Sequence, residues 1–289
     1  MTTHSQLREK ICKLNIDLQR YGLVAWTSGN VSERMEDGKS FMIKPSGVMY
    51  EELKPSQMII CDLDGNVLEG ELVPSSDTQT HAYIYRHMSH INGVVHTHSN
   101  YAAAWAAIHS AIPCALTAMA DEFGGEIPLG PFALIGNDAI GKGVVETLSG
   151  HRSSAVIMKN HGVFSIGKDA TAAVKSAVMC EDVAKTTWIA KSLGTLQLID
   201  QESVDKLFDR YQIPLAILTN TSVYDICPEV LVPFRERGDE FVGHGRTNSE
   251  RQIDMDEATE RAMLQEVRER FIQEEGKAPK VWLGPFISP

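Results

Sequence analysis

The stretch Val94-Val95-His96-Thr97-His98-Ser99 combines a short apolar run with two histidines that are separated by one residue. Side chains at positions i and i+2 of a β-strand point to the same face, so this pattern places two imidazoles side by side. A third histidine follows much later in Asn160-His161-Gly162. Three histidine nitrogens are a typical ligand set of catalytic zinc, which keeps one coordination position open for substrate. The sequence therefore predicts a site for zinc, or for another divalent cation, at these three histidines.

The residues around these motifs alternate between helical and strand patterns, which favours an α/β fold. Short apolar runs predict strands at 41–44, 58–62, 67–69, 93–98, 155–158 and 163–166. Helical periods and capping residues predict helices at about 5–21, 78–88, 100–108, 138–148 and 170–193. Ser99 and Asp169 precede two of these helices and are candidate N-caps. The turn that carries His161 joins two of the predicted strands.

The composition excludes several classes of partner. The chain has 289 residues, a formal net charge of -11 and an isoelectric point near 5.4, so its field repels nucleic acid and anionic membrane surfaces. No apolar run approaches the roughly 20 residues of a membrane span, and residues 1–13 lack the apolar centre of a secretory signal. The five cysteines form no C-x-x-C pair, as expected for reduced thiols. These features predict a cytoplasmic protein.

The sequence changes character after about residue 200. A helix is predicted at 202–211, but residues 214–242 show no clean period. Residues 254–275 form a charged, helix-favouring run in which Met263, Val267 and Phe271 share one stripe. This stripe predicts a helix that packs or faces a partner rather than a catalytic element.

Six short motifs are spread over residues 5–212. They are Ser28-Gly29-Asn30-Val31-Ser32, Lys44-Pro45-Ser46-Gly47, Asp62-Leu63-Asp64-Gly65-Asn66, Ser75-Ser76-Asp77-Thr78 with His81, His96-Thr97-His98-Ser99 and Asn160-His161-Gly162. In this order and spacing the sequence resembles the class II aldolase/adducin family, and most of all its L-ribulose-5-phosphate 4-epimerase branch. The resemblance implies a three-layer αβα sandwich with a mainly antiparallel central sheet. It also implies a homotetramer with active sites at subunit interfaces, a catalytic domain at 1–212 and a C-terminal extension at 213–289.

The resemblance assigns His96, His98 and His161 as the metal ligands. Asp77 stands where the epimerases carry aspartate and the aldolases carry a glutamate acid/base, which favours the epimerase branch. An aspartate after two serines is also a common helix N-cap, so a structural role for Asp77 stays open. His81, one helical turn later, is expected to support the site rather than to bind the metal.

Two further acid/base groups are implied by the resemblance. Asp121 matches the acid/base aspartate of the epimerases, although Met119 stands where they have histidine. Tyr211 is the candidate for the C-terminal tyrosine that a neighbouring subunit brings to the site, with Tyr224 as the alternative. Each of these residues could instead be an ordinary surface or packing residue.

A phosphate cradle is also implied by the resemblance. Backbone N–H groups and hydroxyls at glycine turns and at a helix N-terminus complement a dianion without a Walker sequence. The cradle residues are Asn30, Lys44, Ser46, Gly47, Ser75 and Ser76, with Lys44 as the charge partner.

Three functions are compatible with these residues. The first is zinc-dependent epimerisation of L-ribulose 5-phosphate to D-xylulose 5-phosphate by retro-aldol cleavage and re-addition, in which the metal acts as Lewis acid. The second is a class II aldolase that cleaves another sugar phosphate or hydroxy-ketone. The third is a metal-free interaction domain like the adducin head, which shares the fold without the ligands. The intact histidine trio favours the two enzymes over the third.

Overall fold

The computed structural model describes residues 4–135, 138–212, 216–237, 240–247 and 255–279, with the side chains of 210–212, 216–218 and 236–237 outside the described part. The chain divides into two compact units, Met1–Asp209 and Arg210–Pro289. The boundary falls inside helix α7 (Gln201–Gln212). Each unit has a hydrophobic core of its own.

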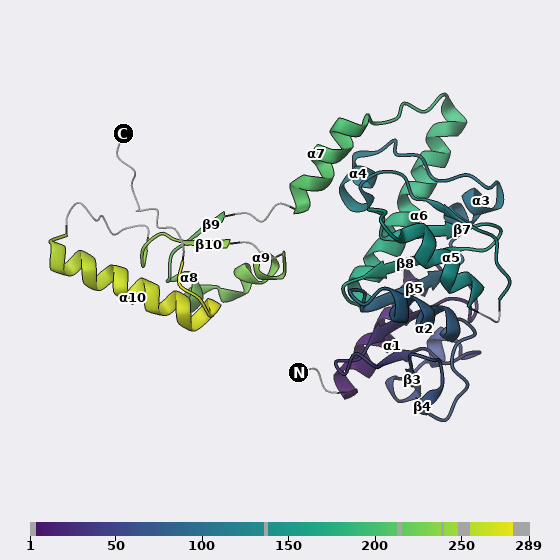
Figure 1. Cartoon of the computed structure of the whole chain (residues 1–289), viewed down its shortest axis with the longest axis horizontal. Helices are drawn as coiled ribbons and strands as arrows, with labels where there is room; N and C mark the ends of the chain where they lie inside the picture. Colours follow the sequence, from purple (N-terminus) through teal and green to yellow (C-terminus); the bar gives the residue numbers. More distant parts are fainter. Residues whose placement is uncertain (1–3, 136–137, 213–215, 238–239, 248–254, 280–289) are drawn as a thin grey trace. The chain divides into compact units, whose positions relative to one another are not determined.

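The first unit is built around an eight-stranded sheet of order β4-β3-β2-β1-β5-β8-β7-β6 (Figure 1). Its strands are β1 (Asn30–Arg34), β2 (Ser40–Ile43), β3 (Ile59–Asp62), β4 (Val67–Glu69), β5 (Gly93–Thr97), β6 (Leu129–Gly130), β7 (Ala155–Met158) and β8 (Val163–Gly167). Neighbouring strands are antiparallel except β6 and β7, which are parallel. The predicted α/β class and mainly antiparallel sheet are therefore confirmed. The histidine-bearing strand β5 lies in the interior of the sheet.

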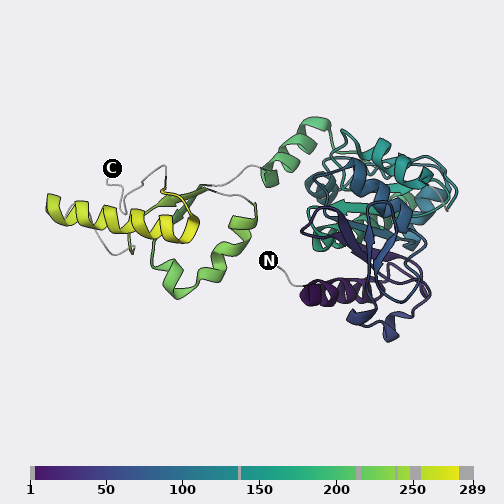
Figure 2. The ribbon, with the colours of Figure 1, turned by 60° about the horizontal axis from the view of Figure 1, so that its bottom comes forward.

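Alternating side chains of the strands bury two hydrophobic clusters on opposite faces of this sheet. Val94 of β5 belongs to one cluster and Val95 to the other. The cluster around Val95 includes residues of α1 (His4–Arg20) and α6 (Ala170–Leu193), and the cluster around Val94 includes residues of α2 (Thr78–His87) and α5 (Ala139–Leu148). Figure 2 shows the same ribbon after a turn of 60°, with α1 in purple. Helices thus cover both faces.

The remaining helices of this unit are α3 (Asn100–Ala107), α4 (Thr117–Phe123) and two short 3₁₀ helices, Tyr50–Glu52 and Pro55–Gln57. Asp169 caps α6 as predicted, because its carboxylate accepts from the backbone N–H of Ala172 over 2.8 Å. The predicted cap at Ser99 is wrong, since this side chain makes no capping hydrogen bond to α3. Among the described helices, none has both the length and the apolar character that a bilayer span requires.

The second unit contains a parallel pair of strands, β9 (Ala216–Thr219) and β10 (Glu240–Gly243). Between them lie α8 (Val223–Ile226), a 3₁₀ helix (Pro228–Leu231) and α9 (Val232–Arg237), and α10 (Glu257–Glu275) follows β10. Met263, Val267 and Phe271 of α10 are buried in one cluster with Tyr224. The stripe of α10 is therefore a packing face, as predicted.

Candidate active site

The three predicted metal ligands converge in the structure. His96 lies on β5, His98 follows the end of that strand, and His161 lies in the turn between β7 and β8. Their candidate ligand atoms all lie within 4.8 Å of one another. The Nε2 atoms of His96 and His98 are 2.8 Å apart. The arrangement gathers three imidazoles at one end of two paired interior strands.

The ring of His96 is fixed by two contacts. Its Nδ1 lies 2.8 Å from the carbonyl oxygen of Val163, which can only accept, so Nδ1 carries the proton. The ring also stacks on Phe164, with centroids 4.2 Å apart and planes inclined by 14°. Metal-binding histidines commonly donate their second N–H to such a carbonyl, which leaves the other nitrogen as the ligand atom. Nε2 of His96 is therefore the atom offered to a metal.

His161 is presented by a tight turn. Asn160 has a left-handed backbone with φ of 54°, and the backbone N–H of His161 donates to Met158 over 3.0 Å. Gly162 allows close approach of the turn to β5, since a Cβ there would lie 2.4 Å from the carbonyl oxygen of Thr97. Nε2 of His161 is buried and has no hydrogen-bond partner. A buried nitrogen of this kind fits a metal ligand, because burial without a partner otherwise costs free energy.

Desolvation favours the neutral form of the three rings. It lowers the pKa of His96 to about 3, against a smaller opposing influence of Asp77. Burial also lowers the pKa values of His98 and His161 below their ordinary range. Neutral imidazole is the form that binds a metal, so the site is poised for a cation at neutral pH.

Asp77 lies at the start of α2, but its carboxylate makes no capping hydrogen bond, which removes the simple capping interpretation. Instead, Nδ2 of Asn30 donates to Oδ2 of Asp77 over 2.7 Å. Burial raises the pKa of Asp77, but the nearby His96 and His81 rings and the Asn30 hydrogen bond together hold it below its ordinary range. A buried carboxylate therefore lies within electrostatic reach of the histidines.

Hydrogen bonds join the predicted cradle loops to one another. Nδ2 of Asn30 also donates to Oγ of Ser75 over 2.8 Å, and the N–H of Ser75 donates to the carbonyl oxygen of Lys44 over 3.1 Å. Ser46, Gly47 and Ser76 are exposed beside these contacts. Asn30 is paired with His96 across β1 and β5, so the cradle adjoins the histidines.

Lys44, the predicted charge partner of the cradle, is buried, with only 1% of its surface exposed. Its Nζ donates to the carbonyl oxygens of Thr27 (3.1 Å) and Pro45 (3.3 Å) and lies 5.0 Å from the ring centroid of Tyr50. Burial lowers the pKa of Lys44 to about 8. An ammonium group has three donors, so one remains for an anion.

The affinity for a phosphorylated substrate is expected to fall as the pH rises through about 8, because Lys44 then loses its proton. A phosphate monoester is already dianionic above pH of about 7, so its own titration does not contribute. The Lys44→Met variant should raise KM about tenfold and remove the pH dependence, since a charge-assisted hydrogen bond contributes about 1.5 kcal/mol. KM measured between pH 7 and 10 tests this. The exposed Lys39→Met is the control, and parallel profiles for the wild type and Lys44→Met would contradict the assignment.

A buried hydrogen-bonded chain behind the site was missed from the sequence. Nδ1 of His81 lies 2.6 Å from Oγ of Ser32, which lies 2.7 Å from the hydroxyl of Tyr85. Burial lowers the pKa of His81 to about 4, so the ring is neutral. His81 and Tyr85 are one helical turn apart, and Ser32 shares a strand face with Asn30, so this spacing is the signal that could have revealed the chain.

The remaining acid/base candidates lie on other elements of the chain. Asp121 lies in α4, where its buried Oδ1 has no hydrogen-bond partner in the described part of the chain. Tyr211 falls in α7, but its side chain lies outside the described residues. Tyr224 is 6% exposed and packs in the core of the second unit. The histidines, Asp77 and several residues of the predicted cradle are thus the candidates that the structure brings together.

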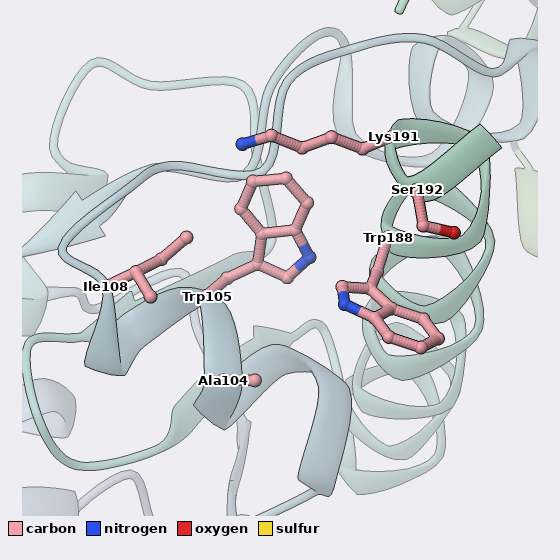
Figure 3. Close-up of a pocket in the computed structure, with 6 residues that line it drawn as sticks. All are labelled: Ala104, Trp105, Ile108, Trp188, Lys191 and Ser192. Atoms are coloured by element: carbon pink, nitrogen blue, oxygen red, sulfur yellow. The ribbon is translucent and has the colours of Figure 1, made fainter. Parts of the chain in front are cut away.

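A separate cavity of about 310 Å³ lies between α3 and α6 (Figure 3). It is lined by Ala104, Trp105, Ile108, Trp188, Lys191 and Ser192. None of the predicted site residues lines it. The cavity therefore marks the packing of these two helices rather than the histidine site.

The family profile described as Class II Aldolase and Adducin N-terminal domain matches residues 9–188. This match covers more than half of the chain, and the chain belongs to the class II aldolase/adducin family. The family resemblance deduced from the six motifs is thereby confirmed.

Several solved structures share this fold with the chain. An L-fuculose 1-phosphate aldolase is 25% identical, with a TM-score of 0.67 over 72% of this chain and 96% of that one. The L-fuculose-1-phosphate aldolase of Thermus thermophilus is 25% identical, with a TM-score of 0.55 over 67% of this chain and 98% of that one. Escherichia coli YgbL, a putative aldolase/epimerase/decarboxylase, is 24% identical, with a TM-score of 0.63 over 71% of this chain and 98% of that one. The last likeness concerns the fold alone.

Proposed function

We propose that residues 1–212 form a metal-dependent enzyme that breaks and remakes a carbon–carbon bond of a phosphorylated ketose. The observation that carries this proposal is the pairing of Asn30 with His96, which supports a phosphate cradle next to the three converging imidazoles. Neither feature is needed by a scaffold protein. Residues 213–289 are an extension to which we assign no part in the chemistry.

The donor set fits a divalent cation. His96, His98 and His161 would hold it through three neutral nitrogens, which is a common arrangement for catalytic zinc. A cation bound there supplies Lewis-acid stabilisation of the negative charge that develops on substrate oxygens during cleavage. The ring of Phe164 stacks on His96 and gives that side of the ligand an apolar neighbour.

The specific reaction that we propose is the interconversion of L-ribulose 5-phosphate and D-xylulose 5-phosphate. A base removes the C4 hydroxyl proton, the C3–C4 bond breaks, and its electron pair moves into the three-carbon fragment as an enediolate. The two-carbon aldehyde that carries the phosphate rotates and is attacked on its other face, and the new C4 alkoxide regains a proton. The acid/base groups are drawn from Asp77, Asp121 and Tyr211, of which Tyr211 would come from a neighbouring subunit of a homotetramer.

The cradle explains why the aldehyde would be retained. Hydrogen bonds join Asn30, Ser75 and Lys44, so the two loops would already be held together when the phosphate binds. The donors left for the phosphate would be the Ser75 hydroxyl and the third N–H of the Lys44 ammonium group. Asn30 also holds the Asp77 carboxylate in place. Holding the phosphorylated fragment during its rotation favours re-addition over release, which is the difference between an epimerase and an aldolase.

A true aldolase is the second candidate, because the 25% identical structure is named an L-fuculose 1-phosphate aldolase. The test incubates the metal-loaded full chain separately with L-ribulose 5-phosphate, D-xylulose 5-phosphate and L-fuculose 1-phosphate and identifies the products. Interconversion of the two pentose phosphates supports the epimerase. Accumulation of an aldehyde and a ketone fragment from any of them supports the aldolase, and inertness towards every phosphorylated ketose contradicts both.

A further inference from the structure

The helix that follows the metal site lacks a cap of its own. Helix α3 begins at Asn100, directly after His98 and Ser99. The first N–H groups of a helix have no partners within the helix and require an acceptor from elsewhere. Ser99 does not provide it, and its hydroxyl is buried without a hydrogen-bond partner. The start of α3 therefore depends on another element.

A carboxylate of α6 supplies the missing acceptor. Oε1 of Glu181 accepts from the backbone N–H of Tyr101 over 2.9 Å, and Oε2 accepts from the N–H of Ala102 over 2.9 Å. Both oxygens are thus used on successive amides of the first turn. A negative charge at a helix N-terminus is also favoured by the helix dipole, and charge-assisted bonds are stronger than neutral ones. Tyr101 and Glu181 are 80 residues apart in the sequence, so this is a long-range contact.

The two hydrogen bonds that Glu181 accepts hold the segment that carries His98. Helix α6 packs on β5 and β8, the strands that frame the histidine trio. His98 lies between the end of β5 and the start of α3, so β5 fixes its backbone on one side and Glu181 on the other. We propose that Glu181 is a positioning residue that holds His98 in ligand geometry. This inference rests on the proposed metal-dependent function.

A second hydrogen bond between α3 and α6 provides the control. Nε1 of Trp105 donates to the carbonyl oxygen of Ala184 over 3.1 Å, at the wall of the cavity in Figure 3. Trp105→Phe removes this bond far along α3 from His98 and leaves the first turn untouched. Asp182 is exposed and adjacent to Glu181, so Asp182→Ala removes a charge from α6 without touching α3.

The experiment titrates the metal-free full chain with Zn²⁺ against a chromophoric chelator, at a temperature where every variant is folded by circular dichroism. Glu181→Ala should weaken Zn²⁺ binding about 10- to 100-fold, which is the usual effect of removing a group that orients a ligand. Glu181→Gln keeps one acceptor oxygen and should give a smaller loss, and it replaces the alanine variant if that one fails to fold. Trp105→Phe should lower Tm while retaining the wild-type Zn²⁺ affinity, and Asp182→Ala should change neither.

Three different results would overturn the inference. If the wild type binds Zn²⁺ and both Glu181 variants bind it within twofold of the wild type, Glu181 only stabilises the helix pair and the proposed function stands. If the wild type itself binds no Zn²⁺, the proposed function and the positioning role fail together. A loss of affinity in Trp105→Phe equal to that in Glu181→Ala would also contradict a specific role for the carboxylate.

Discussion

Replacing His96 with alanine is expected to abolish stoichiometric metal binding and to lower the rate of sugar-phosphate conversion about 10³-fold or more. His96 is the buried member of the trio, and its Nε2 is already aimed at His98 by the contact of Nδ1 with Val163. Loss of a Lewis acid removes several kcal/mol of transition-state stabilisation, and each 1.36 kcal/mol is about tenfold in rate. Metal analysis and the product assay on the same sample measure both effects.

The matched control is His90→Ala, because His90 is an exposed histidine outside the cluster. It should keep the metal content and rate of the wild type. A His96→Ala protein that is folded, metal-free and fully active would contradict the role of the trio. Such a result would leave the cradle without a metal partner and would favour another chemistry.

Gly162→Ala is expected to lower the free energy of unfolding by about 2–3 kcal/mol and to weaken metal binding about tenfold or more. The added Cβ would lie 2.4 Å from the backbone oxygen of Thr97 and 2.7 Å from Cδ2 of His98. A backbone atom cannot rotate away, so the turn must shift and carry His161 with it. Chemical denaturation and Zn²⁺ titration of the same variant measure the two losses.

Gly194→Ala is the control for this substitution, since a Cβ at Gly194 would meet nothing within 4 Å. Its φ of 170° is extended backbone that alanine adopts freely. This variant should match the wild type in both measurements. Gly162→Ala with unchanged stability would show that the hairpin can move away from β5 without cost, against the close packing described above.

Much of the first unit was predictable because its strands and helices bury strongly patterned faces. Strand β7 is wholly apolar, β5 and β8 carry short apolar runs, and the amphipathic α1 and α5 follow a helical period. Helix α4 was missed because only seven residues form it, which is too short for a periodic signal. The parallel contact of β6 with β7 involves two residues of β6, so its direction depends on tertiary packing alone.

The site was predictable to the extent that its residues share short-range spacing. The His-x-His pattern predicts two neighbouring ligands at the end of β5, whereas the spacing gives no local signal that brings the distant His161 to them. The predicted N-cap at Ser99 was wrong for a physical reason. Two oxygens of Glu181 in α6 accept from the first N–H groups of α3, in place of the Ser99 hydroxyl. Long-range contacts of this kind leave no local trace in the sequence. The role of Tyr211 stays a prediction, because its side chain lies outside the described residues.

His96 and His98 differ in how freely they can adapt to an ion. His96 is paired with Asn30 on one side and with Phe164 on the other, so its backbone cannot move without breaking two ladders. His98 lies past the last residue of β5 and is free of both ladders. The backbone of His98 is held instead through the start of α3, which Glu181 binds, so an ion of different radius or preferred angle would be accommodated by a shift of that helix start. The preference for one metal over another would then depend on residues outside the sheet, while the sheet holds His96 in a fixed position.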